Sequence, residues 1–436
     1  MRVGAARKTP DCVAAGGRVR IHALQRWSRW APGTNGQWSM LPVVVHGWAE
    51  FAADGDGVVK VDSATPLAGT YRRPDPLGLL WSAIPRGDAR LPNSIPAAVA
   101  ALDVAQEGVV VLCLEHEGQF TGRTQLESRG APASVRVARV EQADLVGVLA
   151  TPADADHLPT VVVLHGSEGA DLQSCRAAAE VYAAKGFAAL ALAWYAAEWK
   201  GVKNVSTDGI NVPIEVLERA HAFLRTRKEV DATRIGVVGS SKGAELAVFA
   251  ATRFPWIKAV VGWVPSDVVW EGFGRAPATG ETASTWSVAG TPVPYVPLIQ
   301  FDPAKPGQWK SNTQRYNTSR AQASAAVVDA ARIPIEKSTA AFLLLAGERD
   351  EVWASADMTK ALVARMQQAG KSNQIEYEIY PQAGHQIGGV GVFPVWLYAA
   401  PDDNLDGLRE GRDVLATGEA VVRAWPRAIE FLRKKL

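Results

Sequence analysis

The sequence predicts two domains, a β-sandwich followed by an α/β domain with a mostly parallel sheet. Short strands separated by turns run from about residue 18 to 142, with little helical signal. From residue 143 to 436, apolar strands instead alternate with amphipathic helices, which is typical of a sheet covered by helices on both faces. The length of 436 residues suits two or three domains.

The N-terminal part begins with a basic segment and continues as β structure. The first 30 residues carry six arginines and one lysine against a single acid, Asp11, which suits a transit peptide or a poorly ordered basic tail, and we expect such a tail over residues 1–17. The sequence Asp-Gly-Asp-Gly at 54–57 is a strong turn signal. Residues 135–140 alternate strictly between apolar and polar, as a half-buried strand does. We therefore predict a sandwich over residues 18–142, with strands near 43–48, 58–62, 109–116 and 135–140.

The second domain is predicted to be one large α/β unit with a long insertion. Its strands are expected at 160–164, 187–192, 234–239, 257–263, 341–346 and 375–380. Its helices are expected at 174–185, 214–227, 244–253, 355–369 and 418–434. Between about 267 and 332 the alternation stops, and the chain becomes rich in Pro, Gly, Thr and Trp. A long irregular segment in a compact domain is usually functional, so we expect a lid over an active site.

Composition excludes several classes of protein. The 46 basic and 45 acidic residues give a net charge of +1, which argues against a protein that binds nucleic acid through its phosphates. Three scattered cysteines with no C-x-x-C spacing predict neither a metal site nor disulfides, and we expect no cofactor. No apolar run is long enough to span a membrane, and no secretory signal peptide is evident, so we expect a cytoplasmic protein.

One sequence motif indicates a catalytic site. Residues 239–243 read G-S-S-K-G, which matches G-x-S-x-G, and they lie between an apolar strand and a helix. That context is typical of the nucleophile elbow of the α/β-hydrolase fold, where the central serine projects above the sheet from a sharp turn. A tight turn without catalytic function is the alternative. We therefore predict Ser241 to be a nucleophile.

A serine nucleophile needs a base and an acid, which follow it in that fold in the order Ser, acid, His. Of the seven histidines only His385 follows Ser241, in a loop directly after a strand. Asp350, which follows the strand at 341–346, is the preferred acid. The competitors are Asp267, which follows the preceding strand, and the nearby Glu348 and Glu351. We predict a triad of Ser241, Asp350 and His385.

The oxyanion hole of such an enzyme combines two backbone N–H groups. One belongs to the residue after the nucleophile, here Lys242. The other comes from the loop after an early strand, residues 165–169, and we assign it to Ser167. We expect the Lys242 side chain to attract an anionic substrate or to point to solvent, and His165 to be a packing residue.

These residues resemble a known family, the acyl-CoA thioesterases and the bile acid-CoA:amino acid N-acyltransferase (BAAT). The strings that carry the resemblance are 76–81 (PLGLLW), 185–195 (KGFAALALAWY), 239–246 (GSSKGAEL), 333–336 (IPIE), 347–353 (GERDEVW) and 380–385 (YPQAGH). The resemblance spans about residues 40 to 436. It implies an immunoglobulin-like sandwich followed by an α/β-hydrolase domain, with the Ser241, Asp350 and His385 triad acting on an acyl thioester.

The resemblance also suggests how the acyl group is released. The amino-acid-conjugating branch uses a cysteine nucleophile, whereas Ser241 matches the thioesterase branch and favours water as acceptor. Two segments depart from the family: the loop 166–169 carries Glu168 where the family has glycine, and 267–332 matches poorly. We expect a small-molecule acyl substrate, with acyl-CoA as the first choice, and the two departures keep other leaving groups open. The alternatives are a carboxylesterase or dienelactone-hydrolase-like enzyme without CoA, acyl transfer to an amine, and a binding protein that has kept an inactive hydrolase fold.

Overall fold

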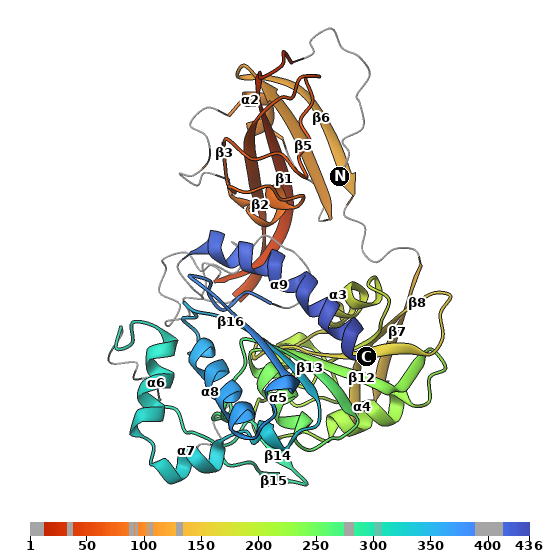
Figure 1. The fold of residues 1–436 in the computed structure, drawn as a ribbon, viewed down its shortest axis with the longest axis vertical. Coiled ribbons are helices and arrows are strands. Elements are labelled where there is room, and N and C mark those ends of the chain that lie inside the picture. The colour runs from red at the N-terminus through yellow and green to blue at the C-terminus, as the bar shows by residue number, and fades with distance from the viewer. Residues whose placement is uncertain are drawn as a thin grey trace. The chain divides into compact units, whose positions relative to one another are not determined.

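The computed structural model describes residues 13–32, 38–86, 91, 95–102, 104, 108–127, 134–273, 283–300, 302, 305, 307–388 and 413–436. Most of the predicted basic tail, residues 1–12, lies outside this part of the chain. The described residues form two compact units, one up to residue 127 and one from residue 134 onward (Figure 1).

The smaller unit is built on one antiparallel sheet with strand order β3-β2-β1-β5-β6, and β4 also pairs with β2. Its strands are β1 (Arg18–Pro32), β2 (Trp38–Ala52), β3 (Ala68–Gly69), β4 (Ile84–Pro85), β5 (Val109–His116) and β6 (Gln119–Glu127). Two short helices are α1 (Gly78–Trp81) and α2 (Ala97–Ala100). Every described strand of this unit belongs to that sheet, so the two facing sheets of the expected immunoglobulin-like sandwich stay a prediction.

A buried polar chain crosses three neighbouring strands of the smaller unit. His22 on β1 lies with its Nδ1 2.9 Å from Nε2 of His46 on β2, and its Nε2 is 2.8 Å from Oε2 of Glu115 on β5. All three side chains are buried. Desolvation by burial lowers the pKa of His22 and lowers that of His46 to about 3, so His46 is neutral in the folded protein.

The larger unit contains an eight-stranded sheet with the order β7-β8-β10-β9-β12-β13-β16-β17. The six strands from β10 to β17 in this order are parallel, whereas β8 is antiparallel to both β7 and β10. Their bounds are β7 (Val135–Gln142), β8 (Leu145–Pro152), β9 (Leu158–Leu164), β10 (Ala188–Leu192), β12 (Val230–Ser240), β13 (Ile257–Trp263), β16 (Ala341–Gly347) and β17 (Ile375–Tyr380). The predicted α/β architecture is confirmed for this unit.

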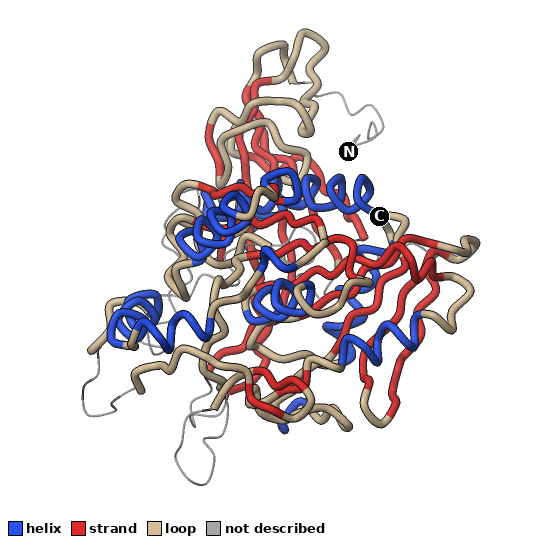
Figure 2. The backbone as a smooth tube through the Cα atoms, turned by 60° about the horizontal axis from the view of Figure 1, so that its bottom comes forward, coloured by secondary structure: helices blue, strands red, loops and turns tan. Residues whose placement is uncertain are grey.

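Helices cover both faces of this sheet because its central strands are apolar on both faces (Figures 1 and 2). Val162 and Leu164 of β9 face one way, toward α4 (Val216–Leu224), α5 (Lys242–Ala251) and α8 (Ser355–Gln368). Val161 and Val163 face the other way, toward α3 (Leu172–Ala183) and α9 (Val414–Lys435). Short 3₁₀ turns are η1 (Glu198–Lys200), η2 (Ile335–Lys337) and η3 (Ser372–Gln374).

The domain boundary expected at residue 142 stays a prediction, but β7, which was expected in the sandwich, lies in the larger unit. This strand pairs with β8 along its whole length, from Val135 opposite Pro152 to Gln142 opposite Leu145. It is the edge strand of the eight-stranded sheet, with Val135 and Val137 packed against the core on one face and Val140 in the core on the other. Alternation does not specify which sheet a strand joins, so periodicity alone placed this strand in the sandwich.

The insertion, expected at about 267–332, contains more regular structure than its composition suggests. Two short strands, β14 (Trp286–Val288) and β15 (Thr291–Pro292), form a small sheet with β11 (Val212–Pro213). Two helices follow, α6 (Asn312–Gln322) and α7 (Ala325–Ala331). The insertion has a small apolar core of its own, which also includes Trp353 and Met358 from the neighbouring acid loop and α8. Its buried members are Val268, Trp270, Val296, Val328, Ala331, Trp353 and Met358.

Candidate active site

The predicted nucleophile lies at a sharp turn in the middle of the larger sheet. Ser241 joins β12 to α5 and has φ 54° and ψ −121°, a backbone conformation that non-glycine residues rarely adopt. Such a conformation costs about 1–3 kcal/mol and is held by its surroundings. The Ser241 N–H donates to the carbonyl of Trp263 on β13 at 2.9 Å, and its own carbonyl accepts from Ala244 and Glu245.

The turn depends on close packing of backbone against backbone. Gly243, in the first turn of α5, lies directly against the carbonyls of Leu164 and His165 at the end of β9, and a Cβ atom would overlap both. The glycine therefore lets α5 begin beside the loop 165–169. The sequence prediction of a nucleophile elbow agrees with this geometry.

The predicted acid and base lie together. Asp350 follows β16 and His385 follows β17, two neighbouring parallel strands whose ends meet at one edge of the sheet. Nδ1 of His385 is 2.8 Å from Oδ2 of Asp350, and both residues are only 6% exposed. An Nδ1–H bonded to the carboxylate leaves Nε2 as the acceptor, which is the tautomer of a general base.

Further hydrogen bonds fix the Asp350 carboxylate. Its Oδ1 accepts the N–H groups of Val352 at 2.9 Å and Trp353 at 3.1 Å, and Oδ2 also accepts the hydroxyl of Ser355 at 2.6 Å. The hydroxyl of Thr313, from α6 of the insertion, donates to the Asp350 carbonyl at 2.8 Å. The sequence analysis did not single out Ser355 or Thr313. The position of Ser355, five residues after the predicted acid, was a sequence signal that could have indicated its role.

The competing acid Asp267 is held by a different partner. Its two carboxylate oxygens each accept a hydrogen bond from the Arg320 guanidinium at 2.7 Å, and the residue is 1% exposed. This bidentate pair ties the start of the insertion to α6. The geometry therefore favours Asp350 over Asp267 as the partner of His385.

The predicted oxyanion loop packs beside Ser241. A Cβ atom built on Gly166 would lie 3.2 Å from Cβ of Ser241, so the loop backbone passes next to the nucleophile. His165 is packed as expected: its ring stacks on Trp194 with 4.7 Å between centroids, and desolvation lowers its pKa to about 3. Ser167 and Glu168 are the two exposed residues of the loop 165–169.

The Glu168 carboxyl group turns back onto this loop. Its Oε1 accepts the N–H of Gly166 at 2.9 Å. Desolvation by the surrounding protein raises the pKa of Glu168, against the hydrogen bonds from the loop backbone and the positive charge of Lys200 and His385. Because part of the residue stays accessible to solvent, the rise is smaller than a fully enclosed carboxyl group would show.

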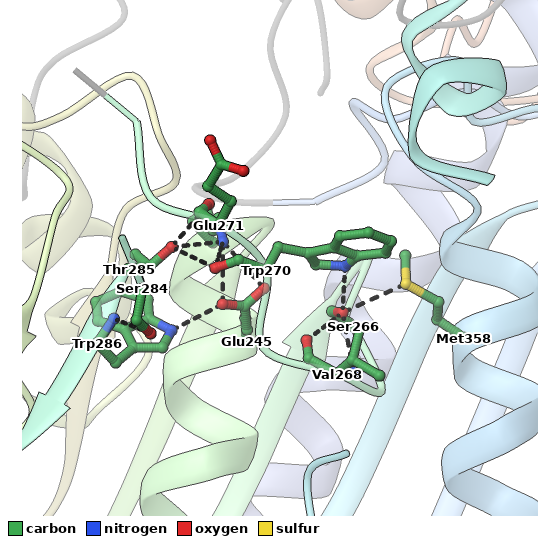
Figure 3. A network of polar contacts seen from close by, with 10 residues as sticks. Glu245, Ser266, Val268, Trp270, Glu271, Ser284, Thr285, Trp286 and Met358 are labelled. Atoms are coloured by element: carbon green, nitrogen blue, oxygen red, sulfur yellow. Dashed lines mark hydrogen bonds and ion pairs between the residues drawn. The ribbon is translucent and has the colours of Figure 1, made fainter. Parts of the chain in front are cut away.

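The expectation for the Lys242 side chain is wrong, because it neither faces solvent nor is free to attract a substrate. It is 3% exposed, and its Nζ lies 3.0 and 3.2 Å from the two carboxylate oxygens of Glu245, which is fully buried. Thr285 accepts from Nζ at 2.8 Å, and the indole N–H of Trp286 donates to Glu245 at 2.8 Å (Figure 3). Helix geometry places the pair three residues apart on one face of α5.

This network joins the insertion to the nucleophile helix. Trp270, Thr285 and Trp286 of the insertion lie around Glu245 of α5 in Figure 3, and Lys242 comes from the same helix. Burial lowers the pKa of Lys242 and raises the pKa of Glu245, and the charge of each partner opposes the shift of the other. The sequence signal that could have indicated this pair is a lysine and a glutamate three positions apart at the start of an otherwise apolar helix.

No group of three or more His, Cys, Asp or Glu suited to a metal ion occurs among the residues that the structure places. None of the helices in that part of the chain is both long enough and apolar enough to cross a bilayer.

Three family models match the chain. "Acyl-CoA thioester hydrolase/BAAT N-terminal region" matches residues 43–142, and "BAAT / Acyl-CoA thioester hydrolase C terminal" matches residues 212–436. "Dienelactone hydrolase family" matches residues 145–271, the part that contains the loop 165–169 and Ser241.

Curated relatives give the same result. Acyl-coenzyme A thioesterase 2, mitochondrial, of Mus musculus is 28% identical over 89% of this chain and 79% of its own length. Acyl-coenzyme A thioesterase 5 of Mus musculus is also 28% identical, over 89% of this chain and 86% of its own. Acyl-coenzyme A thioesterase 1 of Homo sapiens is 26% identical over 89% of this chain and 86% of its own length. With its C-terminal model matching more than half of the sequence, the chain belongs to the acyl-CoA thioester hydrolase/BAAT family of hydrolases.

Proposed function

We propose that this protein hydrolyses acyl thioesters, acyl-CoA first among them, to a free acid and a thiol. The observation that carries the proposal is the buried His385–Asp350 hydrogen bond of 2.8 Å, at the same sheet edge as a serine in an elbow conformation. Family membership supports the thioester as the substrate class. The relatives named above are acyl-coenzyme A thioesterases.

In the proposed mechanism, Ser241 Oγ attacks the thioester carbonyl while its proton passes to Nε2 of His385. Asp350 holds the imidazole in the required tautomer and stabilises the imidazolium that forms. The N–H groups of Lys242 and Ser167 stabilise the negative charge on the carbonyl oxygen. The C–S bond then breaks, and the leaving thiolate takes the proton from His385.

Water completes the turnover. His385 removes a proton from a water molecule, which attacks the acyl-enzyme, and the free acid leaves as Ser241 regains its proton. A serine nucleophile, which matches the thioesterase branch of the family resemblance, supports water over an amine as the acceptor. An amide product formed in the presence of added glycine or taurine would show the other outcome.

We further infer that the insertion forms a wall of the substrate site. Trp286 of the insertion packs against Trp194, with 4.8 Å between ring centroids, and Trp194 donates its indole N–H to the His165 carbonyl. Phe273 packs edge-on against Tyr195, next to the same loop. Aromatic side chains from the insertion therefore lie close to the proposed oxyanion loop, where an acyl chain would bind.

The test is thiol release from a panel of acyl-CoA substrates of different chain length. The wild type should release free thiol, and Ser241→Ala should abolish release while the protein stays folded. Asp350→Asn should lower kcat by a factor on the order of 10⁴, because the imidazole then adopts the wrong tautomer. Asp267→Asn is the matched control: it changes a buried aspartate held by Arg320 and should leave kcat within about tenfold at a temperature where the variant is folded.

A second candidate is an esterase of the dienelactone-hydrolase type, which acts without CoA. The match of residues 145–271 to that family model and the carboxyl group of Glu168 in the oxyanion loop favour it. Hydrolysis of oxygen esters or lactones, with no thiol release from acyl-CoA and with Ser241 still labelled by a fluorophosphonate, would support this candidate over the first.

A further inference from the structure

Glu168 is an unusual residue for its position. It lies in the loop proposed to stabilise an oxyanion, and an ionised carboxylate there would repel the negative charge that develops on the substrate. The loop exposes Ser167 and Glu168, whereas Gly166, Gly169 and Ala170 are buried. Ser167 and Glu168 are therefore the residues of this loop that are most accessible from outside the protein.

One carboxyl oxygen of Glu168 is bonded to the loop backbone, and the other lies beside Gly166, the residue that packs against the nucleophile. Oε1 accepts the Gly166 N–H at 2.9 Å, which fixes the orientation of the group. A Cβ atom built on Gly166 would lie 2.5 Å from Oε2 and 3.2 Å from Cβ of Ser241. Oε2 of Glu168 and Cβ of Ser241 therefore both lie next to Gly166, so this carboxyl oxygen is close to the nucleophile.

The charge of the Glu168 carboxyl group depends on its burial and on the charged groups near it. Lys200 of η1 and His385 of the loop after β17 act on Glu168 with positive charge, but Lys200 donates its hydrogen bond to the carbonyl of Gly169 at 2.8 Å. His165, on the same loop, is neutral because desolvation lowers its pKa to about 3. Desolvation also raises the pKa of Glu168 itself, which favours a carboxyl group that keeps its proton.

We propose that Glu168 is a further catalytic residue, a neutral acid whose Oε2–H donates a hydrogen bond to the oxyanion beside the amides of Lys242 and Ser167. The proposal rests on the acyl-transfer chemistry proposed above and deepens it. When Ser241 Oγ bonds to the carbonyl carbon, the π electrons move onto the oxygen and the serine proton goes to His385. Glu168 keeps its proton throughout and contributes one hydrogen bond.

The proposal predicts an alkaline limit to activity. As pH rises and Glu168 loses its proton, a donor becomes a negative charge beside the oxyanion, so kcat/KM should fall. Glutamine has the same shape and an N–H₂ donor but does not ionise in this range. Glu168→Gln should therefore keep activity at neutral pH within about tenfold of the wild type and lose the alkaline limb.

The experiment measures kcat and KM against pH for the wild type, Glu168→Gln and Glu168→Ala, on an acyl-CoA and on a p-nitrophenyl ester of the same acid. Glu168→Ala removes the donor and should lower kcat by about 10²–10³-fold with a small change in KM. Glu180→Gln is the control, because this α3 glutamate pairs with Arg176 at the surface and should leave the pH profile unchanged.

Three results would overturn the proposal: an alanine variant as active as the wild type, a glutamine variant as inactive as the alanine variant, or a glutamine variant that keeps the alkaline limb. If Glu168→Ala does not fold, the glutamine variant still decides between these results through its pH profile. A wild type that hydrolyses the ester but not acyl-CoA would refute the thioester function alone, and the Glu168 comparison would then be made on the ester.

Discussion

The buried Lys242–Glu245 pair allows a prediction of how its removal changes the free energy of unfolding. We consider Glu245→Met, Lys242→Met and the double variant, because methionine is close in length to both side chains and carries no charge. Glu245→Met leaves Lys242 Nζ with two described acceptors, the Thr285 hydroxyl at 2.8 Å and the Trp270 carbonyl at 3.5 Å. It also removes the acceptor of the Trp286 indole N–H.

The single variants should be costly and the double variant much less so. Removing one partner of a buried ion pair destabilises by about 3–5 kcal/mol, because the other charge stays buried without compensation. Replacing both partners by apolar residues is often nearly neutral. In the double variant the unpaired Trp286 indole remains, at a cost of about 1–3 kcal/mol. We therefore expect each single change to lower the free energy of unfolding by about 3–5 kcal/mol and the double change by about 1–3 kcal/mol.

Urea unfolding followed by tryptophan fluorescence and by far-ultraviolet circular dichroism measures these differences. The larger unit should show a lowered midpoint in both single variants and a recovered midpoint in the double variant. Additive effects, with a double variant less stable than either single one, would refute the conclusion that the two charges compensate each other. A matched surface control is Lys360→Met with Asp357→Met, an exposed pair on α8 whose removal should change stability by less than about 1 kcal/mol.

Two further predictions concern the oxyanion loop and the smaller unit. Gly166→Ala should lower kcat by about tenfold or more in the thiol-release assay, because the new methyl group meets the Glu168 carboxyl oxygen at 2.5 Å and Ser241 Cβ at 3.2 Å; unchanged kcat would contradict the close approach. In the folded protein the pKa of His46 is about 3, so His46 stays neutral, whereas in the unfolded chain it binds a proton below about pH 6.5. The free energy of unfolding therefore decreases as the pH is lowered below about 6.5. The expected loss is about 2 kcal/mol at pH 5, measured by urea unfolding, and His46→Gln should reduce this dependence; an equal dependence in that variant would refute the assignment.

The sequence was sufficient for the parts of the fold that follow from regular patterns. Apolar strands alternating with amphipathic helices predicted the larger sheet, and the positions of Ser241 and His385 after strands predicted where they lie. Chain order together with sequence context favoured Asp350 over Asp267, and the structure shows that Asp267 is engaged elsewhere, because Arg320 binds both of its oxygens. Arg320 lies in α6, which the sequence analysis did not find, so that partner was not predictable.

What the sequence did not reveal depends on contacts between distant segments. Helix α6 is polar on all sides, so it shows no apolar period, although Ser311 caps its start by accepting the N–H of Gln314. The burial of Lys242 depends on Thr285 and Trp286, more than forty positions further along the chain. The role of β7 as an edge strand depends on its pairing with β8, which alternation alone does not specify.

The separate apolar core of the insertion has a consequence for how this protein family can diversify. Val268, Trp270, Val296 and Val328 belong to a core that is separate from the two cores of the sheet, whereas Val269, Trp286 and Val293 of the same insertion belong to one of those two cores. Substitutions confined to the separate core therefore alter one part of the insertion without altering the two cores of the sheet. Under the proposed function, this part of the insertion can diverge between relatives while the proposed catalytic residues Ser241 and His385 keep their positions.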